Sequence, residues 1–188
     1  MTTARRLHYT YAEYLAALEM SEVRLEYCEG EIYAMAGGTR AHAALIASVI
    51  RLLGNAFLSR CVVYASDLKV RIEATDLSTY PDATVVCGES QVAVIDPLAT
   101  TNPTVLVEVT STSTEDYDRG EKLNHYKQIP SLKSVLIVSH RRQQITVFER
   151  AGSAWEQREY RTGERLALTE PELALSVDEL YAGITLES

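Results

Sequence analysis

One amphipathic segment, residues 39–57, constrains the fold more than any other part of the sequence. Its apolar residues recur with a period near 3.6, which predicts a helix with one buried face, and Thr39 after Gly37–Gly38 is a suitable N-cap. A helix of this kind packs against another layer of structure. Segments rich in Val and Ile follow it at residues 61–73, 83–87 and 104–110, and they are typical of strands.

A second helix is predicted after these strands, from Ser113 or Thr114 to about Gln128, and Pro130 would end it. Residues 134–139 then form a short apolar segment of the kind found in fully buried strands. The order helix, three strands, helix, strand predicts an α/β domain with a mixed central sheet flanked by helices. We place this core at about residues 40–140 of a single domain spanning residues 1–188.

Both ends of the chain add smaller elements to this core. Residues 10–36 begin with a capping-box pattern, which predicts a short helix over 11–19 as a lid or brace, and continue as a hairpin that turns at Glu29–Gly30. Residues 144–183 contain a second predicted hairpin around Gly152 and a last short helix near Ser176. We therefore expect one hairpin at each end, with Trp155 packed in the second.

Composition limits the classes of protein to which the chain can belong. Its 188 residues are 46% hydrophobic, and no apolar run approaches the ~18 residues of a membrane span. Three widely spaced cysteines, Cys28, Cys61 and Cys87, predict reduced, buried thiols in a cytoplasmic protein without membrane partners. The net charge of −8 argues against broad adhesion to nucleic acid, although a metal site can account for part of the acidity.

Two carboxylates occupy unusual positions in the predicted strands. Glu108 lies within the apolar run 104–110, where an ionised group needs a partner, and Asp82 follows Tyr80–Pro81 at the start of the preceding strand. Glu108 could instead form an ion pair or lie at a sheet edge, and Asp82 could be a turn residue. If the two converge, their oxygens suit one hard divalent cation.

Lys122 is the candidate cation of the same site. Asp118, Lys122 and Tyr126 are four residues apart, so they share one face of the predicted helix. The alternative for Lys122 is an exposed pair with Asp118 that only supports the helix. Phosphodiester hydrolysis needs a metal that activates water and a cation that offsets developing charge, and these three residue types supply that set.

The sequence resembles the PD-(D/E)XK nuclease superfamily, and more closely its "Uma two" family of restriction-endonuclease-like proteins. The resemblance extends over nearly the whole chain, and its most specific part runs from Val105 to Tyr126. The matching segments are Arg24–Glu31, His42, Tyr80–Asp82, Asn102–Pro103, Glu108–Ser111, Ser113–Glu115, Asp118–Lys122 and Tyr126.

This resemblance implies that Asp82 and Glu108 bind Mg²⁺, or Mn²⁺ in its place, together with the Val109 carbonyl. Lys122 would then orient the nucleophile or stabilise the transition state. The usual superfamily lysine lies two residues after the acidic residue, where this chain has Thr110, so Lys122 would supply the ammonium from the helix.

Glu26 and His42 also match recurring family positions, as further ligands or proton-transfer groups. His42 could equally be a cap or a packed side chain. Lys69 could touch phosphate, but its place in an alternating strand favours a solvated side chain.

The expected function is that of a Mg²⁺-dependent endonuclease that hydrolyses DNA, with RNA also open as a substrate. A homodimer or higher homo-oligomer is expected by analogy with nucleases of this fold. The alternative is a catalytically inactive nuclease-fold protein that acts as a dimeric binding or regulatory module, which the negative charge favours.

Overall fold

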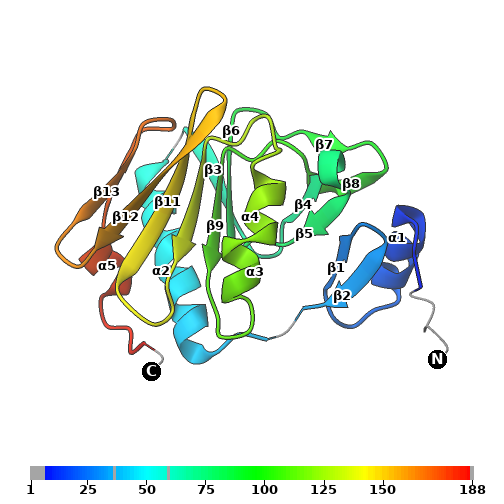
Figure 1. Ribbon diagram of the computed structural model, residues 1–188, viewed down its shortest axis with the longest axis horizontal. Coiled ribbons are helices and arrows are strands. Elements are labelled where there is room, and N and C mark those ends of the chain that lie inside the picture. Colours follow the sequence, from blue (N-terminus) through cyan, green and yellow to red (C-terminus); the bar gives the residue numbers. More distant parts are fainter. Residues whose placement is uncertain (1–6, 36, 59, 187–188) are drawn as a thin grey trace.

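The strands form two six-stranded sheets and one two-stranded sheet in the part of the chain that the structure describes (Figure 1). The structure is a computed structural model, and it describes residues 7–35, 37–58 and 60–186. The predicted α/β class with mixed sheets flanked by helices is confirmed. No helix among these residues is long and apolar enough to cross a membrane.

The first sheet has the order β12–β11–β10–β9–β6–β3 and is mixed, because only β9 and β10 are parallel. Its strands are β3 (Cys61–Ala65), β6 (Ala83–Cys87), β9 (Val105–Val109), β10 (Ser134–Val138), β11 (Gln144–Ala151) and β12 (Ala154–Arg161). The segments 83–87, 104–110 and 134–139 are therefore strands of one sheet, as predicted.

Side chains of β9 alternate between two hydrophobic cores on opposite faces of this sheet. Val105, Val107 and Val109 pack with α2 (Arg40–Ala56), whereas Leu106 packs with α4 (Glu121–Tyr126). The predicted helix over 39–57 and its Thr39 cap are confirmed. Because successive strand residues point to opposite faces, Glu108 shares the α4 side with Leu106.

The predicted helix to about Gln128 is wrong as a single element. It is divided at Gly120, whose backbone (φ −109°, ψ −97°) is not helical, into α3 (Glu115–Arg119) and α4. Gly120 adopts this conformation at little cost because it has no side chain.

The second sheet has the order β2–β1–β5–β4–β8–β7. It contains β1 (Leu25–Cys28), β2 (Glu31–Ala34), β4 (Lys69–Ile72), β5 (Leu77–Thr79), β7 (Val92–Ala93) and β8 (Asp96–Thr100), and the 3₁₀ turn η1 (Glu73–Thr75) joins β4 to β5. The predicted N-terminal hairpin is confirmed as β1–β2, with positive φ at Glu29 and Gly30. The segment 61–73, predicted as one strand region, instead divides between the two sheets as β3 and β4.

Helix α1 (Tyr11–Glu19) covers this second sheet at one end of the molecule (Figure 1). Its predicted capping box is present, and Tyr11 and Tyr14 pack with Tyr27 of β1. The expectation of a solvated Lys69 is wrong. Its side chain is 3% exposed, and its Nζ lies 2.7 Å from Asp96 Oδ2, because β4 is an inner strand between β5 and β8.

The opposite end of the molecule carries the C-terminal hairpin β11–β12 (Figure 1). The hairpin was predicted, and Trp155 does pack there, with the Arg150 guanidinium 4.6 Å from its ring centre. A further hairpin, β13 (Arg165–Leu168) and β14 (Leu173–Ser176), was not predicted. The predicted last helix is α5 (Val177–Tyr181), capped by Ser176.

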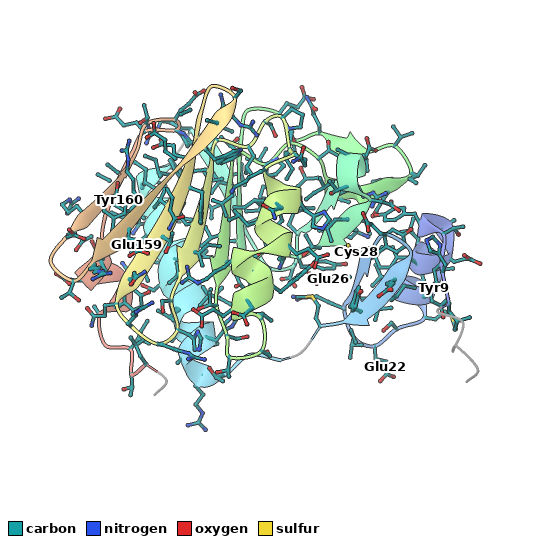
Figure 2. All side chains as sticks on the ribbon, in the orientation of Figure 1. Tyr9, Glu22, Glu26, Cys28, Glu159 and Tyr160 are labelled. Carbon is teal, nitrogen blue, oxygen red and sulfur yellow. A yellow bond between two sulfur atoms is a disulfide. The ribbon has the colours of Figure 1, made fainter. Side chains whose placement is uncertain are left out.

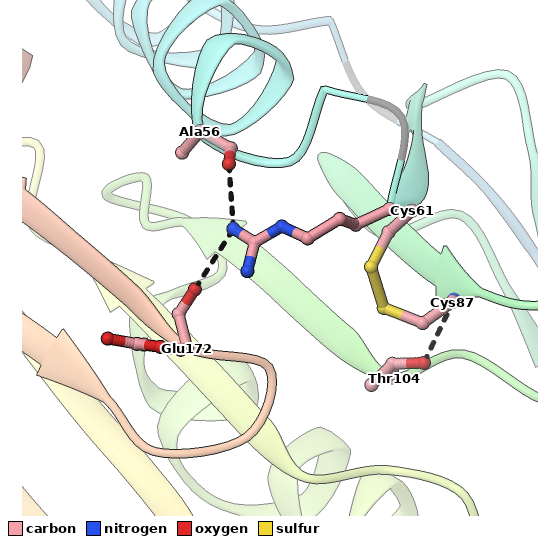
Figure 3. The surroundings of a disulfide bond; sticks show 6 residues. Ala56, Cys61, Cys87, Thr104 and Glu172 are labelled. Atoms are coloured by element: carbon pink, nitrogen blue, oxygen red, sulfur yellow. Dashed lines mark hydrogen bonds between the residues drawn. A yellow bond between two sulfur atoms is a disulfide. The ribbon is translucent and has the colours of Figure 1, made fainter.

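A disulfide joins Cys61 to Cys87, so the prediction of three reduced thiols is wrong for this pair (Figure 3). The two cysteines are direct partners in the antiparallel register of β3 and β6, with Cα atoms 4.2 Å apart. Their separation of 26 residues in the chain gives no indication of that register. Cys28 is the free, buried thiol of the prediction.

We expect reduction of this disulfide to lower the free energy of unfolding by about 2–4 kcal/mol, because the open chain gains conformational entropy when it unfolds. Urea unfolding with and without a thiol reductant measures the change. A Cys28→Ser variant should keep the same sensitivity to the reductant. Equal unfolding midpoints in both buffers would contradict the prediction.

Candidate active site

A cleft of about 530 Å³ lies where the two sheets meet α2, α3 and α4. It is lined by the polar and charged residues Glu26, Thr39, His42, Tyr80, Asp82, Glu108, Ser111, Thr112, Ser113, Thr114, Tyr117, Asp118 and Lys122, and by Ala34, Met35, Gly37, Gly38 and Val109. All six residues selected from the sequence as catalytic or metal-binding therefore border one cavity.

Strand pairing brings the two carboxylates together. Ala83 of β6 is paired with Val107 of β9 in antiparallel register, so the preceding Asp82 lies beside the following Glu108. Asp82 Oδ2 accepts a hydrogen bond of 2.7 Å from the Val109 backbone amide. This bond fixes the aspartate at the end of β9, so Asp82 satisfies a nearby amide, as a turn aspartate would, and also faces the cleft.

Glu108 is buried, with its side chain 4% exposed. Its Oε1 lies 3.0 Å from Lys122 Nζ and accepts a hydrogen bond from the Tyr126 hydroxyl. Burial, with smaller contributions from Asp118 and Asp82, raises the pKa of Glu108 to about 8 against the opposing effects of Lys122 and of the Tyr126 hydrogen bond. The partner that Glu108 needs in an apolar strand is thus the ammonium of Lys122.

Lys122 is the central cation of the cleft, and its side chain is 7% exposed. Its Nζ lies 3.0 Å from Glu108, 3.9 Å from Asp118 and 4.0 Å from Glu26. Burial alone would lower the pKa of Lys122, but these carboxylates outweigh burial and raise it, so the ammonium stays charged. The alternative of an exposed Asp118–Lys122 pair is wrong, because both side chains are buried.

Asp118 is a member of this cluster to which the sequence argument gave no role. Its Oδ2 accepts a hydrogen bond of 2.7 Å from the Thr114 hydroxyl, and burial raises its pKa. Its place four residues before Lys122 was the available signal, but that spacing is also common in exposed helix pairs. Burial, which distinguishes the two cases, depends on how α3 and α4 pack on the sheet.

Glu26 and His42 approach the cleft from other elements. Glu26 Oε1 accepts hydrogen bonds from the Thr79 hydroxyl and from the Tyr80 amide, the latter at 3.1 Å. His42 Nε2 donates to the Val109 carbonyl at 2.8 Å and lies 3.6 Å from Asp82 Oδ2. The His42 amide also donates to the Thr39 side chain, so this residue contributes to the helix cap and to the cleft.

The donor atoms fit a hard divalent cation. Asp82 Oδ2 and Glu108 Oε1 each accept a hydrogen bond. Within the described residues, the second oxygen of each carboxylate accepts none. The Val109 carbonyl keeps a second lone pair besides the one that accepts from His42. Oxygen donors of this kind suit Mg²⁺ or Mn²⁺, and no cysteine is among the described residues that line the cleft.

A family model described as "Uma2: Putative restriction endonuclease" matches residues 11–179 of this sequence. The chain belongs to the Uma2 family. The resemblance inferred from the segments around Asp82 and Glu108–Tyr126 is therefore confirmed. Two relatives from Synechocystis sp. are uncharacterized proteins: slr1290 is 34% identical, covering 92% of this chain and 90% of its own, and sll1609 is 30% identical, covering 76% and 81%.

The Uma2 fold is also seen in a crystal structure from Anabaena variabilis, described as "a putative nuclease belonging to DUF820". The two structures superpose with a TM-score of 0.72 over 88% of this chain and 93% of that one, at 15% sequence identity. This likeness shows that the two proteins share a fold, which agrees with the architecture expected from the sequence.

We expect Lys122→Met to lower the free energy of unfolding by about 3–5 kcal/mol at neutral pH, because it leaves Glu108 and Asp118 buried without their cation. Adding Glu108→Gln to this variant should recover part of the loss, since a neutral pair needs no buried counter-charge. Chemical denaturation of both single variants and the double variant measures the coupling. Strictly additive effects would contradict a direct interaction between the two side chains.

Proposed function

We propose that this Uma2 protein is a Mg²⁺-dependent endonuclease that hydrolyses phosphodiester bonds in DNA. The observation that carries the proposal is the convergence of Asp82, Glu108 and Lys122 in one cleft. The family and the fold support a nuclease. The metal and the nucleic acid are our inference from the chemistry of the cleft.

The metal would be held by the free oxygens of Asp82 and Glu108 and by the Val109 carbonyl. When bound, Mg²⁺ or Mn²⁺ supplies Lewis-acid polarisation of the phosphate and lowers the pKa of a bound water. Asp82 is prepared for this role by the Val109 amide, which holds its other oxygen. Glu108 is held in the same way by Tyr126 and Lys122.

Lys122 would offset the negative charge that develops on the phosphate, or orient the attacking water. Its ammonium stays protonated, and Asp118 and Glu26 hold it from two further directions. Thr110, at the usual lysine position, is fully buried, and its hydroxyl lies 2.8 Å from His140 Nδ1. A cation for the cleft therefore has to come from α4.

Four consecutive hydroxyl residues support a phosphate ligand in the same cleft. Ser111, Thr112, Ser113 and Thr114 follow Thr110 after the end of β9 and line the cavity beside Glu108. The Thr114 hydroxyl donates to Asp118, whereas those of Ser111, Thr112 and Ser113 can donate hydrogen bonds to phosphate oxygens without adding charge. Such contacts suit a chain with a net charge of −8, which lacks the surplus of Lys and Arg that drives non-specific binding.

The same net charge favours a second function, a catalytically inactive nuclease fold that serves as a dimeric binding or regulatory module. In that case the buried contacts of Lys122 with Glu108 and Asp118 would serve stability alone. The two functions differ in one measurable property, which is phosphodiester cleavage dependent on a divalent ion.

We expect the purified protein to cut supercoiled plasmid in Mg²⁺ or Mn²⁺ and to stop when a chelator is added. Asp82→Asn, Glu108→Gln and Lys122→Met should each lower the cleavage rate by at least about 100-fold, because each removes a charge needed in the transition state. The control is Glu89→Gln, which neutralises an exposed carboxylate that does not line the cleft and should cut at the wild-type rate.

Linear duplex, single-stranded DNA and RNA are offered in the same assay to identify the substrate. Cleavage of RNA alone would refute DNA as the substrate. A folded wild-type protein that binds metal and cuts none of them would refute the nuclease and favour the binding module.

A further inference from the structure

A second group of potential ligands lies outside the cleft, between β1 and α4. It consists of Cys28 from β1 and Glu121 and His125 from α4, whose ligand atoms all lie within 4.8 Å of one another. His125 Nε2 is 3.9 Å from Cys28 Sγ and 3.9 Å from Glu121 Oε1. Glu121 and His125 are one helical turn apart, so both point from the same face of α4 toward the thiol.

The imidazole of His125 is buried without an ordinary hydrogen bond. Its side chain is 11% exposed, and its Nδ1 has no hydrogen-bond partner within the described residues. Its Nε2 has only two long contacts, each of 3.9 Å, with the Cys28 thiol and the Glu121 carboxylate. Nε2 therefore faces a thiol and a carboxylate without an ordinary hydrogen bond to either, which is an arrangement suited to a shared metal ion.

The spacing of these atoms is close to that of a tetrahedral metal site. Bonds of about 2.3 Å to sulfur and about 2.0 Å to nitrogen or oxygen place neighbouring ligand atoms roughly 3.5 Å apart. The observed 3.9 Å distances need to close by only a few tenths of an ångström. The Glu121 side chain is 68% exposed and can rotate to make this adjustment.

We propose that Cys28, His125 and Glu121 bind one divalent transition-metal ion of the Zn²⁺ class, with water as the fourth ligand. Sulfur and imidazole nitrogen are the ligands that such ions prefer, whereas Mg²⁺ prefers the oxygens of the cleft. Burial raises the pKa of the Cys28 thiol to about 11, so the ion displaces a proton when it binds.

This ion joins the second sheet to α4 next to the active-site cleft. Cys28 lies two residues after Glu26 on β1, and Glu121 directly precedes Lys122 on α4. Figure 2 shows Glu26 and Cys28 together on β1, on the side of the strand that faces α3 and α4. Glu26 and Lys122, whose charged atoms lie 4.0 Å apart, thus connect the same two elements, β1 and α4, as the proposed metal ion does.

The test uses full-length protein stripped of metal and titrated with Co²⁺ and Zn²⁺. We expect a thiolate-to-cobalt absorption band that saturates at one Co²⁺ per thiol, loss of this band when Zn²⁺ displaces Co²⁺, and a rise in Tm with Zn²⁺. Cys28→Ser should abolish the band, and His125→Ala and Glu121→Gln should each weaken Zn²⁺ binding more than about tenfold.

Two controls separate this site from incidental binding and from the proposed nuclease. His8→Ala removes an exposed histidine, and Asp82→Asn changes the cleft; both should keep the thiolate-to-cobalt band of the wild type. The Glu121 side chain is largely exposed, so we expect the Glu121→Gln variant to fold as the wild type does and to report on metal binding alone. Co²⁺ binding without a thiolate band, or equal Zn²⁺ affinity in wild type and Cys28→Ser, would overturn the proposal.

Discussion

The buried contact between the Lys122 ammonium and the Glu108 carboxylate is the interaction on which the candidate site depends. The Lys122 ammonium lies 3.0 Å from Glu108 and opposes the rise in its pKa that burial causes, and the surrounding carboxylates raise the pKa of Lys122 despite burial. Neither charge would be tolerated alone. The strand β9, the helix α4 and the loop that joins them are therefore fixed relative to one another by charge as well as by packing.

This charge cluster also connects the two sheets. Asp82 and Glu108 come from the first sheet, Glu26 from the second, and Asp118 and Lys122 from the helices between them. A second group of potential ligands also connects the second sheet to α4 beside the cleft, and it includes a sulfur and a nitrogen atom. It consists of Cys28, Glu121 and His125. Two groups of potential metal ligands thus lie next to each other along β1 and α4, one made of oxygen atoms and one that includes sulfur and nitrogen.

Local patterns in the sequence predicted most helices and the strands of the first sheet. Thr39 and the apolar spacing after it defined α2, and Glu29–Gly30 defined the first hairpin, because caps and turns depend on neighbouring residues. The division of segment 61–73 between two sheets, the burial of Lys69 and the Cys61–Cys87 bond depend on strand register, which is not visible in a local pattern. Glu108 was selected because a charge in an apolar strand requires a partner, and the resemblance to the family gave weight to Asp82 and Lys122. Asp118 resembles an exposed helix residue until its burial is known.

The most direct test of the metal site is a calorimetric titration of Mn²⁺ into wild-type, Asp82→Asn and Glu108→Gln proteins. Cys28→Ser serves as the common background, so that the thiol cannot contribute. We predict one ion per chain, with affinity reduced more than about tenfold in each cleft variant, because each loses a charged oxygen ligand. Absence of binding to the folded background protein, or equal affinity in all three, would contradict the assignment of this cluster as a metal centre.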